Sequence, residues 1–357
     1  MMRTTLKAVR RACAVGLASG ALVAATQAAP AAGSAYVSNQ NGEISVIDLA
    51  SMVVSGTIDP QGKEPRGLGV TADGRWLVVA NRADGGISVI ERATGRLVRK
   101  VKIGANPEFV RVRGHMAFVS FEPSSTGKPP PAHGTGADDD DDKQAEPARI
   151  AVVDLTRGRV LRTIKGGPET EGIEFSADGR HILVTNEADE TVTVHAIATG
   201  KRVKTIDLSA HGKRPRGIKR SPDGKTYVAT LEFGNSFVVI GADYRVLRTV
   251  ATGESPYGVA FDRSGQRLFV AAGRSQKLQV FDTASWTLVK EVPTGKRCWH
   301  FTFTPDDQQI LVACGRSDEV VVIDAATLEP TARIADKQLP WGIVTYPKSM
   351  GSLDQPE

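Results

Sequence analysis

The chain has 357 residues, including 36 Gly, 19 Pro, 11 Phe, 5 Tyr and 4 Trp; 41% of its residues are hydrophobic and its formal net charge is +5. A hydrophobic fraction of this size excludes a wholly disordered or collagen-like chain. The length by itself suggests two domains.

The first 28 residues have the pattern of a secretory signal peptide. Four basic residues and no acid precede residue 12, and residues 12–25 are uncharged and mostly small or apolar. Such a run is too short to cross a bilayer. We therefore predict a signal peptide over 1–28, cleaved after Ala28, and a periplasmic protein with no membrane span. The signal peptide holds +4 of the net charge, so the charge does not indicate a nucleic-acid partner.

A short apolar run, usually ending in an acid, recurs along the rest of the chain. Its last residues are Asp48, Glu91, Asp154, His195, Gly241, Asp282 and Asp324. The spacing is about 42 residues, except between the second and third copies, where about 21 extra residues occur. These belong to a Pro-rich and Asp-rich insert at about 121–148, which we expect to be a solvated, disordered loop.

Each period holds four strand-forming runs in a constant order. The first two runs flank a turn such as Ala-Asp-Gly at 72–74, where Gly accepts the positive φ that a tight hairpin needs. Four antiparallel strands per period of 40 to 50 residues, repeated in tandem, are typical of a β-propeller. The sequence therefore predicts an all-β fold.

The number of periods predicts seven blades in one closed domain over 29–350. The segments that begin a period lie near Pro65, Pro107, Thr170, Pro215, Pro256, Cys298 and Pro340. The last segment has no hairpin partner after it, and the first blade has no opening strand. We therefore expect the C-terminal strand to complete blade one, which leaves residues 351–357 as a tail.

The strand sequences Ala-Tyr-Val-Ser-Asn at 35–39 and Ser-Val-Ile-Asp at 45–48 resemble the YVTN type of propeller repeat. Within that group the chain is most similar to exported propeller proteins associated with PQQ-dependent alcohol catabolism. The segments that carry this resemblance are Gly-Lys-Arg-Pro-Arg-Gly at 212–217, Gly-Lys-Arg-Cys-Trp-His at 295–300 and Leu-Pro-Trp-Gly-Ile at 339–343. The resemblance implies an accessory role beside PQQ-dependent alcohol oxidation. The acidic insert departs from the usual repeat.

In a propeller, the innermost strand of each blade begins at the end of the channel where the second strand ends. Residues at these two positions should therefore lie around one mouth of the channel. The candidates are Arg66, Glu108, Glu171, Arg216, Tyr257, Trp299 and Trp341 at strand starts, and Asn39, Asn81, Glu122, Glu187, Glu232 and Cys314 at strand ends. Paired guanidinium donors suit a carboxylate, and indole rings suit a planar compound. The alternative is that Arg and Glu pair across neighbouring blades and only close the ring.

His300 stands where the matching positions 67, 172, 217, 258 and 342 hold Gly. Its side chain is therefore expected to project into the channel, as a proton-transfer or binding residue or as a plain hydrogen-bonded one. No His, Cys or carboxylate spacing indicates a metal site.

Cys298 and Cys314 lie on paired strands, one place out of register. A bulge would bring the two sulfur atoms together, and an oxidising compartment favours a disulfide; two separate thiols are the alternative. No haem-attachment pattern occurs, and no cofactor is expected.

We expect a monomeric, non-enzymatic propeller that binds a small molecule or a periplasmic protein at its channel mouth. The competing hypothesis is a lactonase or isomerase that uses Glu187, Glu232 and His300, because propellers host many activities. A third is an interaction scaffold that works through its outer loops. A close cluster of Glu187, Glu232 and His300 would favour catalysis. Pairing of these side chains with Arg66 or Arg216 would favour binding or a structural role.

Overall fold

The computed structural model describes residue 1 and residues 33–123, 146–336 and 338–356. The expected signal peptide and most of the predicted acidic insert lie outside these residues. In the part that is described, no helix has the length and apolar character needed to cross a membrane.

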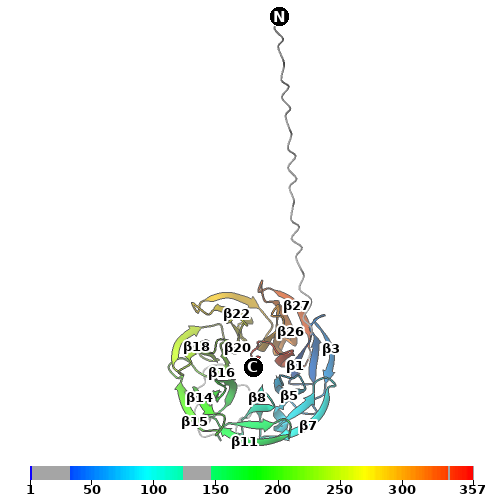
Figure 1. Cartoon of the computed structure of the whole chain (residues 1–357), viewed down its shortest axis with the longest axis vertical. Helices are drawn as coiled ribbons and strands as arrows, with labels where there is room; N and C mark the ends of the chain where they lie inside the picture. The colour runs from blue at the N-terminus through cyan, green and yellow to red at the C-terminus, as the bar shows by residue number, and fades with distance from the viewer. Residues whose placement is uncertain (2–32, 124–145, 337, 357) are drawn as a thin grey trace. The chain divides into compact units, whose positions relative to one another are not determined.

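The described chain forms seven four-stranded antiparallel sheets arranged as blades around a ring (Figure 1). Blade one contains β28 (Pro340–Tyr346), β1 (Ser34–Asn39), β2 (Ile44–Asp48) and β3 (Val53–Ile58), from the inside outward. Blades two to four contain β4 (Pro65–Val70), β5 (Trp76–Asn81), β6 (Gly86–Glu91) and β7 (Arg96–Lys102); β8 (Pro107–Arg113), β9 (Met116–Phe121), β10 (Arg149–Asp154) and β11 (Arg159–Lys165); and β12 (Thr170–Phe175), β13 (His181–Asn186), β14 (Thr191–Ala196) and β15 (Arg202–Asp207).

Blades five to seven follow the same order. They contain β16 (Pro215–Arg220), β17 (Thr226–Leu231), β18 (Ser236–Gly241) and β19 (Val246–Ala251); β20 (Pro256–Phe261), β21 (Arg267–Ala272), β22 (Lys277–Asp282) and β23 (Leu288–Pro293); and β24 (Cys298–Phe303), β25 (Gln309–Cys314), β26 (Glu319–Asp324) and β27 (Pro330–Ala335). The prediction of a seven-bladed, all-β propeller is confirmed.

The ring closes as the sequence predicts. The C-terminal strand β28 pairs antiparallel with β1, with Tyr36 opposite Val344, and so supplies the innermost strand of blade one. The first and last strands of the propeller therefore share one sheet, and the inner edge of β1 is paired with β28.

The predicted hairpin turns also form. In blade two, Gly74 has a φ of 68°, and the Thr71 hydroxyl donates a hydrogen bond of 2.5 Å to the Asp73 carboxylate. The same hydroxyl-to-Asp contact recurs in blades four, five and seven. A local hydrogen bond and a left-handed residue, Gly in blades two, four and five and Asp307 in blade seven, thus explain why each of these hairpins reverses at its Asp.

Small residues let the innermost strands approach one another closely. A Cβ atom added to Gly217 would lie 2.5 Å from the carbonyl oxygen of Tyr257 on the next blade. The Thr230 hydroxyl, on the second strand of the same blade, donates to this carbonyl at 2.6 Å. Gly67, Gly172 and Gly258 approach the next innermost strand in the same way, at 2.4–2.5 Å, so these strand starts lie close together around one end of the channel.

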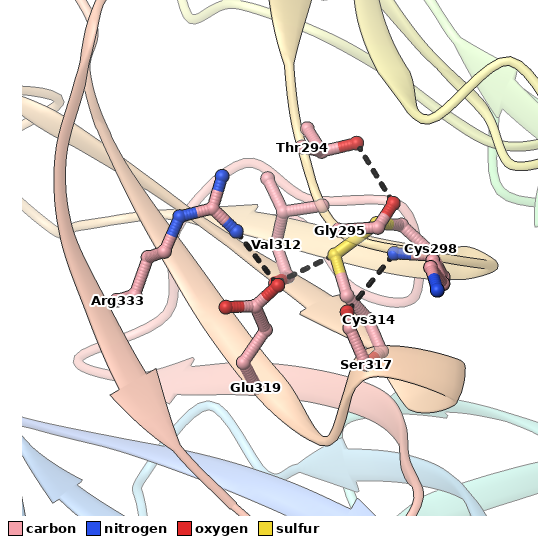
Figure 2. Close-up of a disulfide and its surroundings, with 9 residues drawn as sticks. Thr294, Gly295, Cys298, Val312, Cys314, Ser317, Glu319 and Arg333 are labelled. Carbon is pink, nitrogen blue, oxygen red and sulfur yellow. Dashed lines mark hydrogen bonds and ion pairs between the residues drawn. A yellow bond between two sulfur atoms is a disulfide. The ribbon is translucent and has the colours of Figure 1, made fainter.

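Cys298 and Cys314 are joined by a disulfide between β24 and β25, shown in Figure 2. The ladder of these strands shifts register between Cys298 and His300, so that Cys298 stands opposite Cys314. The same shift occurs near the start of the innermost strand in blades two to six. It is thus the recurring bulge of this propeller that brings the two sulfur atoms into reach.

The last described residues lie inside the ring (Figure 1). Phe303 donates its amide to the Met350 carbonyl at 2.8 Å, and the amide of Ser352 donates to the Phe301 carbonyl at 2.9 Å. Leu353 is fully buried. The expected tail at 351–357 thus includes residues that line the channel interior, and the boundary drawn at 350 falls within this buried segment.

Candidate functional site

The second residue of every innermost strand faces one end of the channel, here called the mouth. A cavity of about 960 Å³ lies there. Its lining includes all seven of these residues, namely Arg66, Glu108, Glu171, Arg216, Tyr257, Trp299 and Trp341. The structure therefore brings together the residues expected at strand starts.

The residues expected at strand ends divide into two groups. Glu122, Glu187 and Glu232 directly follow second strands and line the cavity. The equivalent residues in blades one and two are Gln40 and Arg82, which also line it. The candidates Asn39, Asn81 and Cys314 lie one place earlier, as the last residues of their strands. The Asn39 and Asn81 amides donate to Ser45 at 2.9 Å and Ser88 at 2.8 Å, and Cys314 is in the disulfide.

A further set of cavity residues comes from the position just before each innermost strand. That residue has a positive φ in all seven blades, between 47° and 62°. The residues are Glu64, Asn106, Glu169, Arg214, Ser255, Arg297 and Leu339, of which Glu64, Glu169, Arg214, Arg297 and Leu339 line the cavity. These residues stand at a constant position before the strand start, so the repeat itself could have predicted Glu64 and Glu169, which were not among the sequence candidates.

Arg216 is the centre of a buried ion-pair network. Its guanidinium contacts Glu187, bonds to Glu232 at 2.7 Å and lies 3.4 Å from Glu171. Arg297 reaches Glu232 at 2.8 Å from the other side. Burial by itself would raise the pKa of Glu232, but the two guanidiniums lower it to about 2. Glu232 therefore carries a firmly held negative charge.

A second network joins blades two and three. Arg66 pairs with Glu108, and Arg82 lies 3.3 Å from Glu108 and 2.6 Å from Glu64. Arg66 also lies over the Trp341 ring, 5.7 Å from its centroid. The positive charges of this side of the cavity are thus engaged by carboxylates and an aromatic face.

Glu122 differs from the other cavity carboxylates. Glu122 is 7% exposed, and its carboxyl makes no ion pair with any residue of the described ranges 33–123, 146–336 and 338–356. Burial, and then the charges of nearby carboxylates, raise its pKa well above the ordinary value. Glu122 is therefore a protonated or incompletely neutralised acid at the cavity wall.

Aromatic rings form the floor of the cavity. Trp341 and Tyr257 line it, and His300 packs beneath them with ring centroids 4.4 Å from Trp341 and 5.4 Å from Tyr257. The Tyr257 hydroxyl donates to Glu171 at 2.5 Å. The half-buried Trp299 also faces the cavity and packs against Gly315, where an added Cβ would lie 2.0 Å from the indole.

His300 lies in the channel, as the sequence predicts, but below the cavity rather than in its lining. Its Nδ1 atom is 3.0 Å from the Ser352 hydroxyl, and the residue is 1% exposed. Burial, and then the positive charge of Lys219, lower its pKa well below the usual value. A neutral imidazole bonded to the C-terminal segment is the result.

A layer of charged side chains fills the channel below the floor, here called the lower layer. Arg111 bonds to Glu174 at 2.9 Å and to Asp354 at 3.0 Å. Lys219 lies 3.6 Å from Glu174, and Lys348 lies 3.2 Å from Asp354. Burial, and then Arg111, lower the pKa of Lys219 to about 7. The C-terminal segment thus supplies two of the five charged groups.

The positions of Glu187, Glu232 and His300 distinguish between a catalytic cluster and a binding or structural one. Glu187 and Glu232 both pair with Arg216, whereas His300 bonds to Ser352 beneath them. Within the described ranges, no group of His, Cys, Asp or Glu is placed to hold a metal ion. The geometry therefore favours binding or ring closure over the catalytic cluster of the competing hypothesis.

The fold and the cavity define a seven-bladed β-propeller with a charged mouth and a channel filled below by its own C-terminal segment. No family model matches the sequence. The chain is 25% identical over 206 residues to the uncharacterized protein YncE of Salmonella typhimurium, which covers 55% of this chain and 50% of that protein. It thus spans about half the length of the curated relatives it matches.

Solved structures share the fold over most of the chain. A functionally unknown protein of Desulfotomaculum acetoxidans has a TM-score of 0.72 and 16% identity, over 91% of this chain and 99% of that one. The periplasmic gluconolactonase of Pseudomonas aeruginosa has a TM-score of 0.70 and 16% identity, over 88% and 98%. At these identities the likeness shows the propeller fold alone.

Proposed function

We propose that this propeller is a non-enzymatic binding protein that takes up a small polar molecule in the mouth cavity. The observation that carries the proposal is a cavity of about 960 Å³ whose wall contains Glu122, a buried carboxyl without a described cationic partner. Ligand sites are typically concave, of this size, and equipped with a few convergent polar groups. A wall built only to close the ring would pair its buried charges internally.

The accessory role beside PQQ-dependent alcohol oxidation is part of the same proposal. All three segments that resemble the alcohol-catabolism propellers supply cavity residues: 212–217 supplies Arg214 and Arg216, 295–300 supplies Arg297 and Trp299, and 339–343 supplies Leu339 and Trp341. The resemblance is thus concentrated at the mouth. Export to the periplasm rests on the signal-like segment at 1–28, and N-terminal sequencing of the secreted protein tests it.

Native mass spectrometry of the protein purified from its own periplasm tests the binding function. We expect a retained small molecule of constant mass in the wild type and its loss in Trp299→Ala, which removes an indole from the cavity wall. Leu247→Ser, at a side chain that is 61% exposed on the outer strand β19, is the matched control and should retain the molecule. A wild-type protein that carries nothing and gains nothing from a periplasmic extract contradicts the proposal.

A lactonase remains the second candidate, because the Pseudomonas aeruginosa relative in fold is a gluconolactonase and Glu122 has the raised pKa of a general acid. We expect glucono-1,5-lactone to hydrolyse no faster with the protein than in buffer. Turnover that Glu122→Gln abolishes would support the enzyme and overturn the binding protein.

A further inference from the structure

Five buried or half-buried carboxylates gather on the blade-three and blade-four side of the mouth cavity. This group, here called the acidic wall, consists of Glu108, Glu122, Glu169, Glu171 and Glu187. The guanidiniums that reach the wall are already engaged: Arg66 and Arg82 with Glu108, Arg214 with Glu169 and Glu187, and Arg216 with Glu171 and Glu187. Within the described residues, Glu122 alone among the five has no such contact.

The backbone holds Glu122 firmly in this position. Its amide donates to the carbonyls of Ala105 at 3.0 Å and Asn106 at 3.2 Å, and its carbonyl accepts the Asn106 side-chain amide at 3.0 Å. The residue is 93% removed from solvent yet lines the cavity. Its backbone is therefore held at the cavity wall, and its side chain is one of those that line the mouth.

Buried carboxyl groups in proteins normally have hydrogen-bonding or charged partners, since an unsatisfied one destabilises the fold. The cavity beside Glu122 leaves space for a partner that the described chain does not provide. An ammonium group suits this place, because it carries one positive charge and three donors for surrounding carboxylate oxygens. A metal ion suits it less, because no described group of carboxylates is placed as a ligand set.

We propose that the mouth cavity binds a small organic amine, whose ammonium group donates to Glu122 within the acidic wall. This inference rests on the proposed binding function and names the ligand class. A cavity of about 960 Å³ is of the size that takes a small molecule rather than a folded partner. The half-buried indole of Trp299 offers an apolar face for the carbon skeleton.

The charges that surround Glu122 predict that amine binding depends on pH. Glu108, Glu187, Glu171 and Glu169 act with burial to raise its pKa, and the guanidiniums of Arg66, Arg82, Arg214 and Arg216 balance those four acids. An arriving ammonium group stabilises the ionised carboxyl, so binding should release a proton from Glu122. Binding should therefore be tighter at pH 8 than at pH 6.

Titration calorimetry of the full chain without its signal segment tests the proposal with three amines and their alcohol counterparts. The pairs are ethanolamine and ethylene glycol, putrescine and 1,4-butanediol, and phenethylamine and 2-phenylethanol. We expect at least one amine to bind at least tenfold more tightly than its alcohol in phosphate buffer, with up to one proton released when binding is followed by pH-stat titration in unbuffered salt solution. Glu122→Gln should weaken that binding at least tenfold and abolish proton release.

Glu329→Gln is the matched control, since this exposed carboxylate pairs with Lys290 on the outer surface and should leave binding unchanged. Failure of all three amines to exceed their alcohols overturns the inference, as does amine binding that Glu122→Gln leaves unchanged. Saturable CaCl₂ binding that depends on Glu122 would overturn it in favour of a metal ion. If the native protein retains a ligand that is not an amine, the amine inference is refuted and the proposed binding function stands. If the native protein retains no ligand, both are refuted.

Discussion

The mouth cavity and the lower layer belong to one channel, and both hold buried charged side chains, yet they are built differently. In the lower layer, Arg111 is satisfied by Glu174 and by the carboxylate of Asp354, and the C-terminal segment fills the space between the blades. At the mouth, space remains beside Glu122, whose carboxyl has no described partner. The difference separates charges that are neutralised within the protein from a carboxyl that the proposed ligand would contact.

Removal of residues 348–357 should produce the largest effect. It deletes the buried Met350 and Leu353 and leaves Arg111 without Asp354, and changes of these kinds cost about 2–5 kcal/mol each. We expect the free energy of unfolding, measured by urea denaturation, to fall by about 5 kcal/mol or more. A chain that ends at Gln355 is the control and should lose little. A loss below about 1 kcal/mol for the longer deletion would show that the segment does not support the ring.

Glu232→Gln should destabilise the mouth itself. The folded pKa of Glu232 is about 2 against an ordinary 4.5, a difference equivalent to about 3 kcal/mol at neutral pH. Because the folded pKa is the lower one, this stability is present above pH 4.5 and is lost as the pH falls toward 2. Urea denaturation of wild type and variant between pH 3 and pH 7 should show curves that converge at the acid end. Parallel curves would mean that Arg216 and Arg297 do not hold the charge.

Replacement of Cys298 and Cys314 by Ser should have a somewhat smaller effect. The bond spans a sequence separation of 16 residues, for which loop-closure entropy predicts about 2–3 kcal/mol. The change acts at the mouth end of β24, next to Trp299, and should therefore also weaken ligand retention. Unfolding experiments with and without reductant measure this loss of stability. A wild type whose stability does not change with reductant would contradict the disulfide.

Glu122→Gln should have the smallest effect on stability, with the opposite sign. Because burial raises the folded pKa of Glu122 above its unfolded value, the wild type loses stability as the pH rises past the ordinary carboxyl range. The neutral amide removes this loss, so we expect the variant to be more stable than the wild type at pH 8 and equally stable at pH 4. A variant less stable than wild type at pH 8 would show that the carboxyl has a stabilising partner after all.

Much of the fold could be predicted because its signals are local. The period of about 42 residues, the Asp-Gly turns and the unpaired last strand each depend on residues close in sequence, and they led to seven blades and the correct closure. The mouth residues at strand starts followed from the same periodicity. The strand-end positions were one residue out at Asn39, Asn81 and Cys314, which are the last residues of their strands, whereas the residue after the strand lines the cavity.

The sequence allowed Arg and Glu to pair across neighbouring blades, but it could not predict which side chains pair. Arg216 lies in blade five yet contacts Glu171 and Glu187 of blade four, and no local pattern selects these partners over other acids. The C-terminal segment is the clearest case. Ser352 and Asp354 stand in a short polar stretch without periodicity, and only the ring creates the channel that buries them.

The sequence by itself determined how many blades this protein has, where its turns lie and which residues at the strand starts face the channel, since strand alternation and turn chemistry act over a few residues. Only the tertiary structure decided which of those charges are neutralised. The energy of a buried charge depends on every group within a few ångströms, whatever its position in the chain. Glu122 and Glu232 occupy equivalent positions in their blades, yet Glu122 lies among carboxylates and Glu232 between two guanidiniums.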